Sequence, residues 1–493
     1  MSVVGTYTSP KGSRSLLAPE FPEGARPLCV DLDGTLVKSD TLVDSLLLLL
    51  RTRPADAMKS PLWALKGKAF LKAKVTSLVS LDVAHLPYNE PLLHYLQEAS
   101  LSGRKLYLTT GADGGLATRV AQHLGIFDEM LASDGETNLT GKNKLTGLQQ
   151  RFAGGFDYVG NASVDLPLLA GSVAPMVANP DLGLSWRLKS KKIGIVHTFE
   201  DRKPLHRAML KALRPHQWAK NALLLVPLLL AHTVRLSAVL QVLLGFVCFS
   251  LCASGTYLVN DLLDIEADRR HPKKRLRPFA SGDLKATTGA ALALLLVAGS
   301  FAGAMFLPRD FLTLLSLYVV TTLSYSLYLK RVVLVDVVLL SGLYALRLLA
   351  GGAAVNVAIS PWLTGFSLFL FLSLAIVKRF SELQNTLARG HVPSNGRGYL
   401  LVDIEQLRSF GTASAYASVV VFSLYISGHD VVALYRHASR LWLMTPLMIL
   451  WISRVWLLAG RGAMDEDPVL FALTDRTSLL IGLFVIIIAL TAI

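Results

Sequence analysis

Long apolar segments recur through the second part of this chain, and they constrain its fold more than any other feature. A helix of about 20 apolar residues crosses a bilayer with its backbone hydrogen bonds satisfied internally. The sequence therefore predicts an all-α membrane bundle of nine transmembrane helices. The expected spans are 217–233, 236–260, 286–307, 311–329, 333–354, 361–377, 410–428, 440–459 and 477–493.

The first 195 residues have a different character, because their apolar runs are short and alternate with stretches typical of helices. Four such runs, LCV, KLYLTTG, FDYVGN and MVANP, end in polar residues or glycine, as buried parallel strands do. This pattern predicts a Rossmann-like α/β domain. We therefore expect an α/β domain over 1–195, a linker over 196–216 and a membrane domain over 217–493.

Charge is distributed unevenly between these two parts. Residues 1–200 carry 21 basic and 19 acidic side chains, whereas the remainder carries 28 and 16. Most of this excess lies in alternate loops of the apolar part, which indicates positive-inside topology rather than nucleic-acid binding. The N-terminus lacks the apolar core of a signal peptide. We therefore expect an integral protein of a bacterial inner membrane with a cytosolic N-terminal domain.

Three carboxylates follow the second apolar segment at spacings of three and four residues. On one helix, Asp261, Asp264 and Asp268 would share a face. Clustered carboxylates near a bilayer are costly, and Mg²⁺ bridging them to substrate phosphates would compensate. The basic residues that follow are suited to binding diphosphate oxygens; they are Arg269, Arg270, Lys273, Lys274, Arg275 and Arg277.

A second acidic motif, DLDGT, follows the first expected strand and resembles the first motif of the haloacid dehalogenase-like superfamily. The resemblance implies a phosphatase with Asp31 as nucleophile, Asp33 as general acid/base and a helical cap after the motif. It also implies Mg²⁺ at the site and two phosphate-binding residues, Thr110 and Lys144. The fourth motif, GNASVD, has Asn161 where the family usually has Asp, so Asp165 could take over as a metal ligand.

Asn260–Asp268 matches the NDxxDxxxD motif of the UbiA-type prenyltransferase superfamily, whose members fold as nine-helix membrane bundles. Further stretches resemble its decaprenyl-phosphate phosphoribosyltransferase branch, which joins phosphoribosyl diphosphate to a polyprenyl phosphate with Mg²⁺. These stretches are LRPHQWAKN, DRRHPKKRLRP, YSLYLK, SLAIVKRFSEL, GRGY and DEDPVLFALTDR. The resemblance implies Asp261 and Asp264 as catalytic residues and Asp268 as a further metal ligand. It implies substrate contacts by Asn260, Arg269, Lys274 and Arg277.

The chain departs from ordinary aromatic prenyltransferases at the sixth span, where they have a second DxxxD. This sequence has Lys378, Arg379 and Glu382 there. Two cations suit a donor with an additional phosphate, and we expect all three residues to contact substrate. Other candidates for substrate binding are Lys220, Tyr325, Lys330 and Arg347. Asp336 and Arg347 are eleven residues apart and could face one cavity, whereas Asp467 and Asp475 have no derived role.

These residues favour a bifunctional enzyme that makes polyprenyl-phosphate-phosphoribose and removes its 5-phosphate, for a cell-envelope glycoconjugate. The alternative is a UbiA-type enzyme that moves a polyprenyl chain onto an aromatic ring, with a regulatory or degenerate phosphatase domain. A membrane scaffold with two decayed domains is a third interpretation, which the retained carboxylates and cations disfavour. Lipid length, downstream glycoconjugate and oligomeric state stay open.

Overall fold

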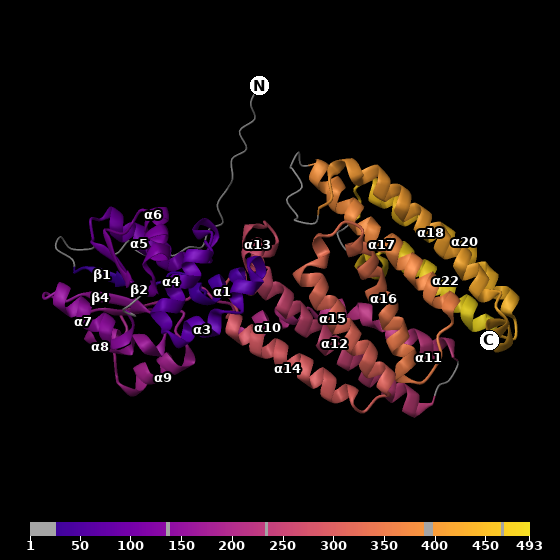
Figure 1. Ribbon diagram of the computed structural model, residues 1–493, viewed down its shortest axis with the longest axis horizontal. Coiled ribbons are helices and arrows are strands. Elements are labelled where there is room, and N and C mark those ends of the chain that lie inside the picture. Colours follow the sequence, from indigo (N-terminus) through magenta and orange to yellow (C-terminus); the bar gives the residue numbers. More distant parts are fainter. Residues whose placement is uncertain (1–25, 135–138, 232–234, 389–397, 465–467) are drawn as a thin grey trace, which may run out of the picture. The chain divides into compact units, whose positions relative to one another are not determined.

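The structure is a computed structural model that describes residues 26–134, 139–231, 235–388, 398–464 and 468–493 (Figure 1). The chain forms two compact units, Met1–Arg202 and Lys203–Ile493. Each unit is described by itself below.

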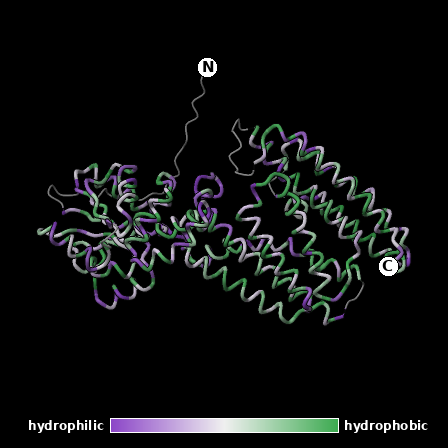
Figure 2. The backbone as a smooth tube through the Cα atoms, in the orientation of Figure 1, coloured by the Kyte–Doolittle hydropathy of each residue, from purple (hydrophilic) through white to green (hydrophobic). Residues whose placement is uncertain are grey.

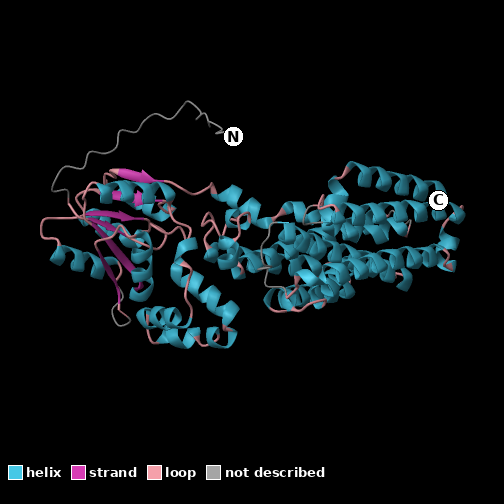
Figure 3. Cartoon of the chain, turned by 90° about the horizontal axis from the view of Figure 1, so that it is seen from above, coloured by secondary structure: helices cyan, strands magenta, loops and turns pink. Residues whose placement is uncertain are grey.

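The first unit is built on a parallel six-stranded sheet, which confirms the expected α/β architecture (Figure 3). The strand order is β3-β2-β1-β4-β5-β6. β1 lies between β2 and β4, with Leu28 opposite both Leu106 and Asp157. The strands are β1 (Leu28–Val30), β2 (Leu106–Asp113), β3 (Glu129–Ser133), β4 (Asp157–Gly160), β5 (Pro175–Ala178) and β6 (His197–Phe199).

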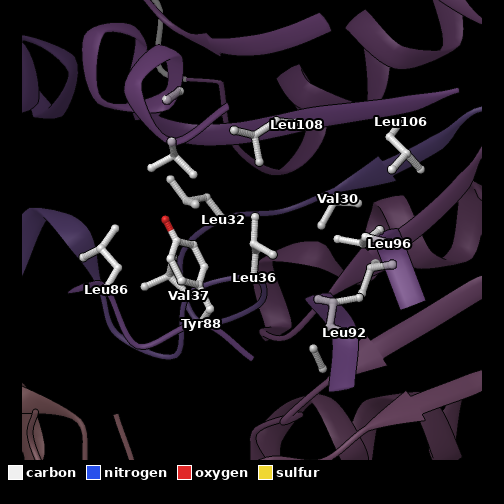
Figure 4. Packing of buried hydrophobic residues seen from close by; sticks show 14 of the residues in the cluster. Val30, Leu32, Leu36, Val37, Leu86, Tyr88, Leu92, Leu96, Leu106 and Leu108 are labelled. Atoms are coloured by element: carbon white, nitrogen blue, oxygen red, sulfur yellow. The ribbon is translucent and has the colours of Figure 1, made fainter. Parts of the chain in front are cut away.

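Helices cover both faces of this sheet, and a hydrophobic core lies under each layer (Figure 1). One core includes Leu32, Leu36 and Val37, so the loop after β1 is anchored by its own apolar residues (Figure 4). The other core contains Tyr158 and side chains of three helices. The helices that cover the sheet are α5 (Glu90–Leu101), α6 (Gly114–Leu124), α7 (Gly141–Arg151), α8 (Leu166–Gly171) and α9 (Leu182–Ser190).

The connection from β1 to β2 holds a group of additional helices, as the sequence predicts for a helical cap. Asp40 begins the first of them by accepting hydrogen bonds from the backbone nitrogens of Leu42 and Val43. The cap helices are α1 (Thr41–Thr52), α2 (Pro54–Ala57), α3 (Ser60–Leu65) and α4 (Lys68–Leu78).

The second unit is helical, and seven of its described helices are long and apolar enough to cross a membrane (Figure 2). These spans are Leu236–Leu263, Ala286–Ala304, Arg309–Leu327, Val335–Ala354, Pro361–Ala388, Leu401–Ile426 and Ala438–Gly460. The principal helices within them are α12 (Leu236–Leu263), α14 (Ala286–Ala304), α15 (Arg309–Leu327), α16 (Val335–Ala354), α17 (Pro361–Ala388), α18 (Ile404–Ile426) and α20 (Met444–Gly460).

The number nine is therefore not confirmed, and the first and last expected spans account for the difference. The first is divided between a 3-10 helix, η3 (Pro215–Leu225), and the short helix α11 (Val226–Leu230). Pro227 supplies no backbone donor at this junction. The last, α22 (Arg476–Ala492), is an apolar helix of 17 residues. Short helices complete the unit: α10 (Leu205–Leu213), α13 (Ile265–Arg270), α19 (His429–Leu434) and α21 (Pro468–Thr474).

Close packing of α16 against η3 depends on a glycine, which provides a test of the helical unit. A Cβ atom added at Gly351 would lie 2.3 Å from the carbonyl oxygen of Leu224, whereas one at Gly342 on the same helix meets nothing within 4 Å. We expect Gly351→Ala to destabilise the unit by about 1–3 kcal/mol, as overpacking does. Gly342→Ala should leave stability unchanged or raise it by up to about 1 kcal/mol. Thermal unfolding of both variants in detergent checks this, and equal midpoints would contradict the packing.

Candidate active sites

The carboxyl edge of the sheet gathers the residues of the phosphatase-like motifs. Asp31 follows β1, Thr110 lies within β2 and Asn161 follows β4. Because β1 is hydrogen-bonded to both β2 and β4, these three positions are neighbours at one edge of a parallel sheet. Lys144 reaches the same place from α7. The strand order thus brings together the residues that the sequence predicted for this site.

Asp31 is held by a buried lysine. The Nζ atom of Lys144 lies 2.7 Å from one Asp31 oxygen and 2.8 Å from the hydroxyl of Tyr158. The hydroxyl of Thr35 donates to the other Asp31 oxygen at 3.2 Å. Burial raises the pKa of Asp31 to about 6, although the Lys144 ammonium opposes this shift. The carboxyl group is therefore fixed in position while its negative charge is only partly compensated.

Asp33 lies beside Asp31, and its pKa is also raised. Burial and the neighbouring Asp40 raise the pKa of Asp33 to about 7, and one Asp33 oxygen accepts a hydrogen bond from the backbone nitrogen of Thr41. Gly34 has a φ of +78°, and a Cβ there would lie 2.1 Å from the Asn161 amide nitrogen. Two undercompensated carboxyls beside an amide oxygen form a donor set that fits Mg²⁺.

Asp165 is engaged differently from the role that the sequence predicted. One of its oxygens accepts from the Tyr158 hydroxyl at 3.0 Å, and the other accepts from the backbone nitrogens of Asn161 and Ala162, each at 3.1 Å. Both oxygens are thus used to shape the loop after β4. The geometry favours Asp165 as a residue that positions Asn161 rather than as its replacement at the metal.

Sequence reasoning missed a lysine that the cap contributes to this site. Lys72, on α4, donates from Nζ to the carbonyl oxygen of Gly111 at 2.5 Å, directly after the expected phosphate ligand Thr110. Burial lowers the pKa of Lys72, while the charges of Asp33, Asp40 and Asp31 oppose that shift. No motif identifies Lys72, because nearly 40 residues separate it from Gly111 and only folding brings them together.

The acidic motif of the membrane unit lies where one helix ends and another begins. α12 ends at Leu263, Asp264 has a φ of −97° and a ψ of 5°, and α13 begins at Ile265. The expectation of one continuous helix with three carboxylates on one face is therefore wrong at Asp264. Asp264 also has a different ion-pair partner from Asp261 and Asp268.

Two arginines neutralise Asp261, whose side chain is 2% exposed. Arg214 donates from Nη2 to both Asp261 oxygens at 2.6 Å. Arg277 donates from Nη1 to Asp261 at 3.1 Å and to Asp268 at 2.6 Å. Arg214 is a second residue without an assigned role in the sequence. It has a φ of +51° and its guanidinium lies 5.5 Å from the centre of the Tyr257 ring.

Asp264 pairs with Lys330, which follows α15. The Nζ atom of Lys330 lies 2.9 and 3.0 Å from the two Asp264 oxygens and 3.4 Å from the side-chain oxygen of Asn260. Among the described residues, no group of three or more His, Cys, Asp or Glu side chains could hold a metal ion. The carboxylates nevertheless fit Mg²⁺ that is bound to a diphosphate. The Arg and Lys side chains that now pair with these carboxylates can bind the phosphate oxygens instead.

The other basic residues that were predicted to bind substrate differ in their burial and contacts. Arg269 is buried and donates from Nε to the carbonyl oxygen of Ala280 at 3.3 Å. Lys274 is half-buried and its charge lowers the pKa of Asp268, although burial, the larger effect, raises that pKa. Lys220 is half-buried on η3. Thus Lys274 lies near the acidic motif, whereas Arg269 supports the loop that follows it.

The structure changes the interpretation of Arg379. Its side chain is 2% exposed, and its Nε lies 2.6 Å from Asp336. Its Nη1 lies 2.8 and 2.9 Å from the two Glu382 oxygens, and its Nη2 donates to the Tyr325 hydroxyl at 3.1 Å. Tyr399 completes the network by donating to Asp336 at 2.5 Å. Arg379, Glu382 and Tyr325 therefore join helices α15, α16 and α17, and the geometry favours a positioning role over direct donor binding. Lys378 is half-buried.

Arg347 and Asp336, which the sequence suggested could face one cavity, belong to separate hydrogen-bond networks. It donates to the side-chain oxygen of Asn221 at 2.9 Å, to the carbonyl oxygen of Leu343 at 2.6 Å and to the Tyr318 hydroxyl at 3.3 Å. None of these partners is Asp336, which pairs with Arg379.

Asp475 has a structural role at the start of α22. Its oxygens pair with Arg454 at 2.6 and 3.1 Å, and one accepts from the backbone nitrogen of Ser478. This arrangement caps the first turn of the helix. Asp467 lies outside the described residues.

The buried network around Arg379 predicts a large loss of stability when its guanidinium is removed. Arg379→Gln leaves Asp336 and Glu382 without their shared cation, and breaking a buried pair on one side costs about 3–5 kcal/mol. Lys378→Gln is the matched control, and we expect a cost below about 1 kcal/mol, as for partly exposed charges. Chemical unfolding in detergent, followed for both variants, checks the difference. Equal destabilisation would contradict the positioning role.

Comparisons with known proteins found relatives of nearly the whole chain and of its second part. A protein from Sinorhizobium fredii, Uncharacterized protein y4nM, is 38% identical over 463 residues, covering 92% of this chain and 89% of that protein. Decaprenyl-phosphate phosphoribosyltransferase from Mycobacterium tuberculosis is 34% identical over 232 residues, covering 45% of this chain and 74% of that protein.

Solved structures include a HAD family hydrolase, t0658, from Salmonella enterica. It is 13% identical with a TM-score of 0.27, and the similarity covers 35% of this chain and 66% of that one. A model described as the UbiA prenyltransferase family matches residues 222–490. Because that match covers more than half of the sequence, this chain belongs to the UbiA prenyltransferase family.

Proposed function

We propose that this chain is a bifunctional membrane enzyme. Its membrane unit transfers phosphoribose from phosphoribosyl diphosphate to a polyprenyl phosphate. Its N-terminal unit then removes the 5-phosphate from the lipid-linked sugar. The observation that carries the proposal is the set of three cations, Arg214, Arg277 and Lys330, paired with the carboxylates of the NDxxDxxxD motif. A diphosphate with Mg²⁺ matches both the acidic and the basic members of this set.

The surroundings of Arg379 support the choice of donor. Ordinary aromatic prenyltransferases of the family use a second acidic motif at this position to hold a second Mg²⁺. Here Asp336 and Glu382 are both neutralised by Arg379. A second metal site would require that buried pairing to break. The relatives named decaprenyl-phosphate phosphoribosyltransferase support the same donor and acceptor.

The transfer step requires little acid–base chemistry from the protein. An oxygen of the polyprenyl phosphate is ionised at neutral pH and attacks the anomeric carbon of the sugar, while the bond to pyrophosphate breaks. Arg214, Arg277 and Lys330 would exchange carboxylate oxygens for phosphate oxygens and stabilise the charge on the leaving group. Bound Mg²⁺ would neutralise diphosphate charge at this site and phosphoryl charge at the N-terminal site.

The dephosphorylation step is assigned to the carboxyl edge of the sheet. Asp31 would attack phosphorus and form an aspartyl-phosphate, while Asp33 donates a proton to the departing 5-oxygen. Water then cleaves the aspartyl-phosphate, with Asp33 taking a proton back. A pKa near 7 suits Asp33 for both directions of transfer. Lys144 is positioned to balance charge beside Asp31.

Topology places both steps on the same side in this proposal. The basic loops indicate the cytosolic side of a bacterial inner membrane, where soluble phosphoribosyl diphosphate would be available. The N-terminal unit would act on a product that stays in the same bilayer. Tethering raises its effective concentration to about the millimolar range.

The test separates the two activities by product mass. Purified protein is incubated with Mg²⁺, phosphoribosyl diphosphate and a polyprenyl phosphate, and the lipids are extracted. We expect wild type to yield polyprenyl-phosphate-ribose. Asp31→Asn should accumulate the lipid that keeps the 5-phosphate, because the nucleophile is lost. Asp261→Ala should lower both products by at least about a hundredfold, more than the about 10–100-fold that outer residues of metal sites cost.

Controls distinguish the two halves of the proposal. A prenyl diphosphate with an aromatic acceptor replaces the substrates in a parallel reaction, and turnover only there would support the aromatic prenyltransferase instead. If the phosphorylated lipid dominates in both wild type and Asp31→Asn, the N-terminal unit is not this phosphatase. Phosphoribosyl transfer would stand in that case.

A further inference from the structure

The helical cap of the N-terminal unit has an apolar face that lies outside both cores of that unit. Met58, Leu62 and Leu65 are 81%, 63% and 85% exposed. Leu62 and Leu65 lie three residues apart on α3, and Met58 directly follows α2, four residues before Leu62. Within these two short helices, all of which the structure describes, no residue is buried. Hydrophobic packing inside the unit does not explain this face.

Basic side chains surround the apolar face. Residues 51–74 hold seven basic residues and one acidic residue, whereas the rest of residues 1–200 holds 14 basic and 18 acidic ones. The segment is therefore strongly positive although the remainder of the unit is negative. Exposed members of this group are Arg53, Lys59, Lys66, Lys68 and Lys74.

This combination has the features of a helix that lies in a membrane interface. Such helices present leucine or aromatic side chains on one face and lysine or arginine on the other. Phe70 at the start of α4 adds a partly exposed ring, and the Nζ atom of Lys66 lies 5.2 Å from the centre of that ring. Lysine stems can cover apolar surface while their ammonium groups stay near lipid phosphates.

The connection between the two units is short. Only residues 200–204 separate β6 from α10, which begins the membrane unit. A short tether removes most of the entropy cost of a weak surface contact. An anionic leaflet attracts clustered Lys and Arg over about one Debye length.

We propose that the α2–α3 face of the cap, defined by Met58, Leu62 and Leu65 with its surrounding lysines, docks onto the anionic surface of the membrane. The docked cap inserts its apolar side chains among the lipid headgroups. Lys72 of the adjoining α4 reaches the backbone after Thr110. The same cap thus connects the lipid surface with the phosphatase-like site. Docking does not depend on which lipid-linked substrate the enzyme uses.

The test measures contact of the cap with lipid in the full chain. Leu65→Cys is labelled with a small environment-sensitive fluorophore, and the protein is placed in nanodiscs whose lipids carry bromine near the headgroup. The native cysteines Cys29, Cys248 and Cys252 are buried. We expect the bromines to quench this label, and more strongly with anionic than with zwitterionic lipids. The matched control is Leu101→Cys, at an 89% exposed site of the same unit, which should show no quenching.

A charge variant adds a second arm. Lys59→Gln, Lys66→Gln and Lys68→Gln are combined with Leu65→Cys, and quenching in anionic nanodiscs should fall to the zwitterionic level. If the Leu65→Cys label is shielded equally in detergent without lipid, the face is covered by protein and docking is wrong. Disulfide-linked dimers through Leu65→Cys would identify a second copy as that cover. A label that stays as unquenched as the one at Leu101→Cys would also overturn the proposal.

Discussion

The compensation of buried carboxylate charge is the interaction on which both candidate sites depend. In the membrane unit each acid of the NDxxDxxxD motif has a basic partner from another part of the chain: Arg214 and Arg277 for Asp261, Lys330 for Asp264 and Arg277 again for Asp268. Without such partners, charges at the end of a membrane helix would be strongly disfavoured. The same pairs join η3, α12, α13 and the segment after α15 around one place.

In the N-terminal site, the charge of the buried carboxylates is compensated only in part. Lys144 is the cation held against Asp31, while burial raises the pKa of Asp31 and Asp33 together. In our proposal, the N-terminal carboxyls would bind Mg²⁺ directly, whereas those of the membrane unit would bind it together with a diphosphate. The two units therefore differ in how they would acquire Mg²⁺.

Sequence patterns predicted the features that depend on the residues within one short segment, such as strands and apolar helices. Strand patterns located Asp31, Thr110 and Asn161, and apolar length predicted nine spans, of which seven are helices that could cross a membrane. Partnerships between distant residues could not be predicted, because no spacing rule connects Arg214 with Asp261 or Lys72 with Gly111. For Arg379, the sequence predicted substrate binding because two cations replace a second acidic motif. The structure pairs it inside the bundle with Asp336, 43 residues earlier, and no local pattern indicates that pair.

Mg²⁺ titration tests whether Arg214, Arg277 and Lys330 hold the acidic motif of the membrane unit until a diphosphate binds. Calorimetry on a variant in which Asp31 and Asp33 are replaced by Asn isolates the membrane site. We expect no measurable binding of Mg²⁺ alone and clear binding once phosphoribosyl diphosphate is present, and we expect Asp261→Asn to abolish that binding. Tight Mg²⁺ binding without a diphosphate that Asp261→Asn abolishes would contradict this expectation.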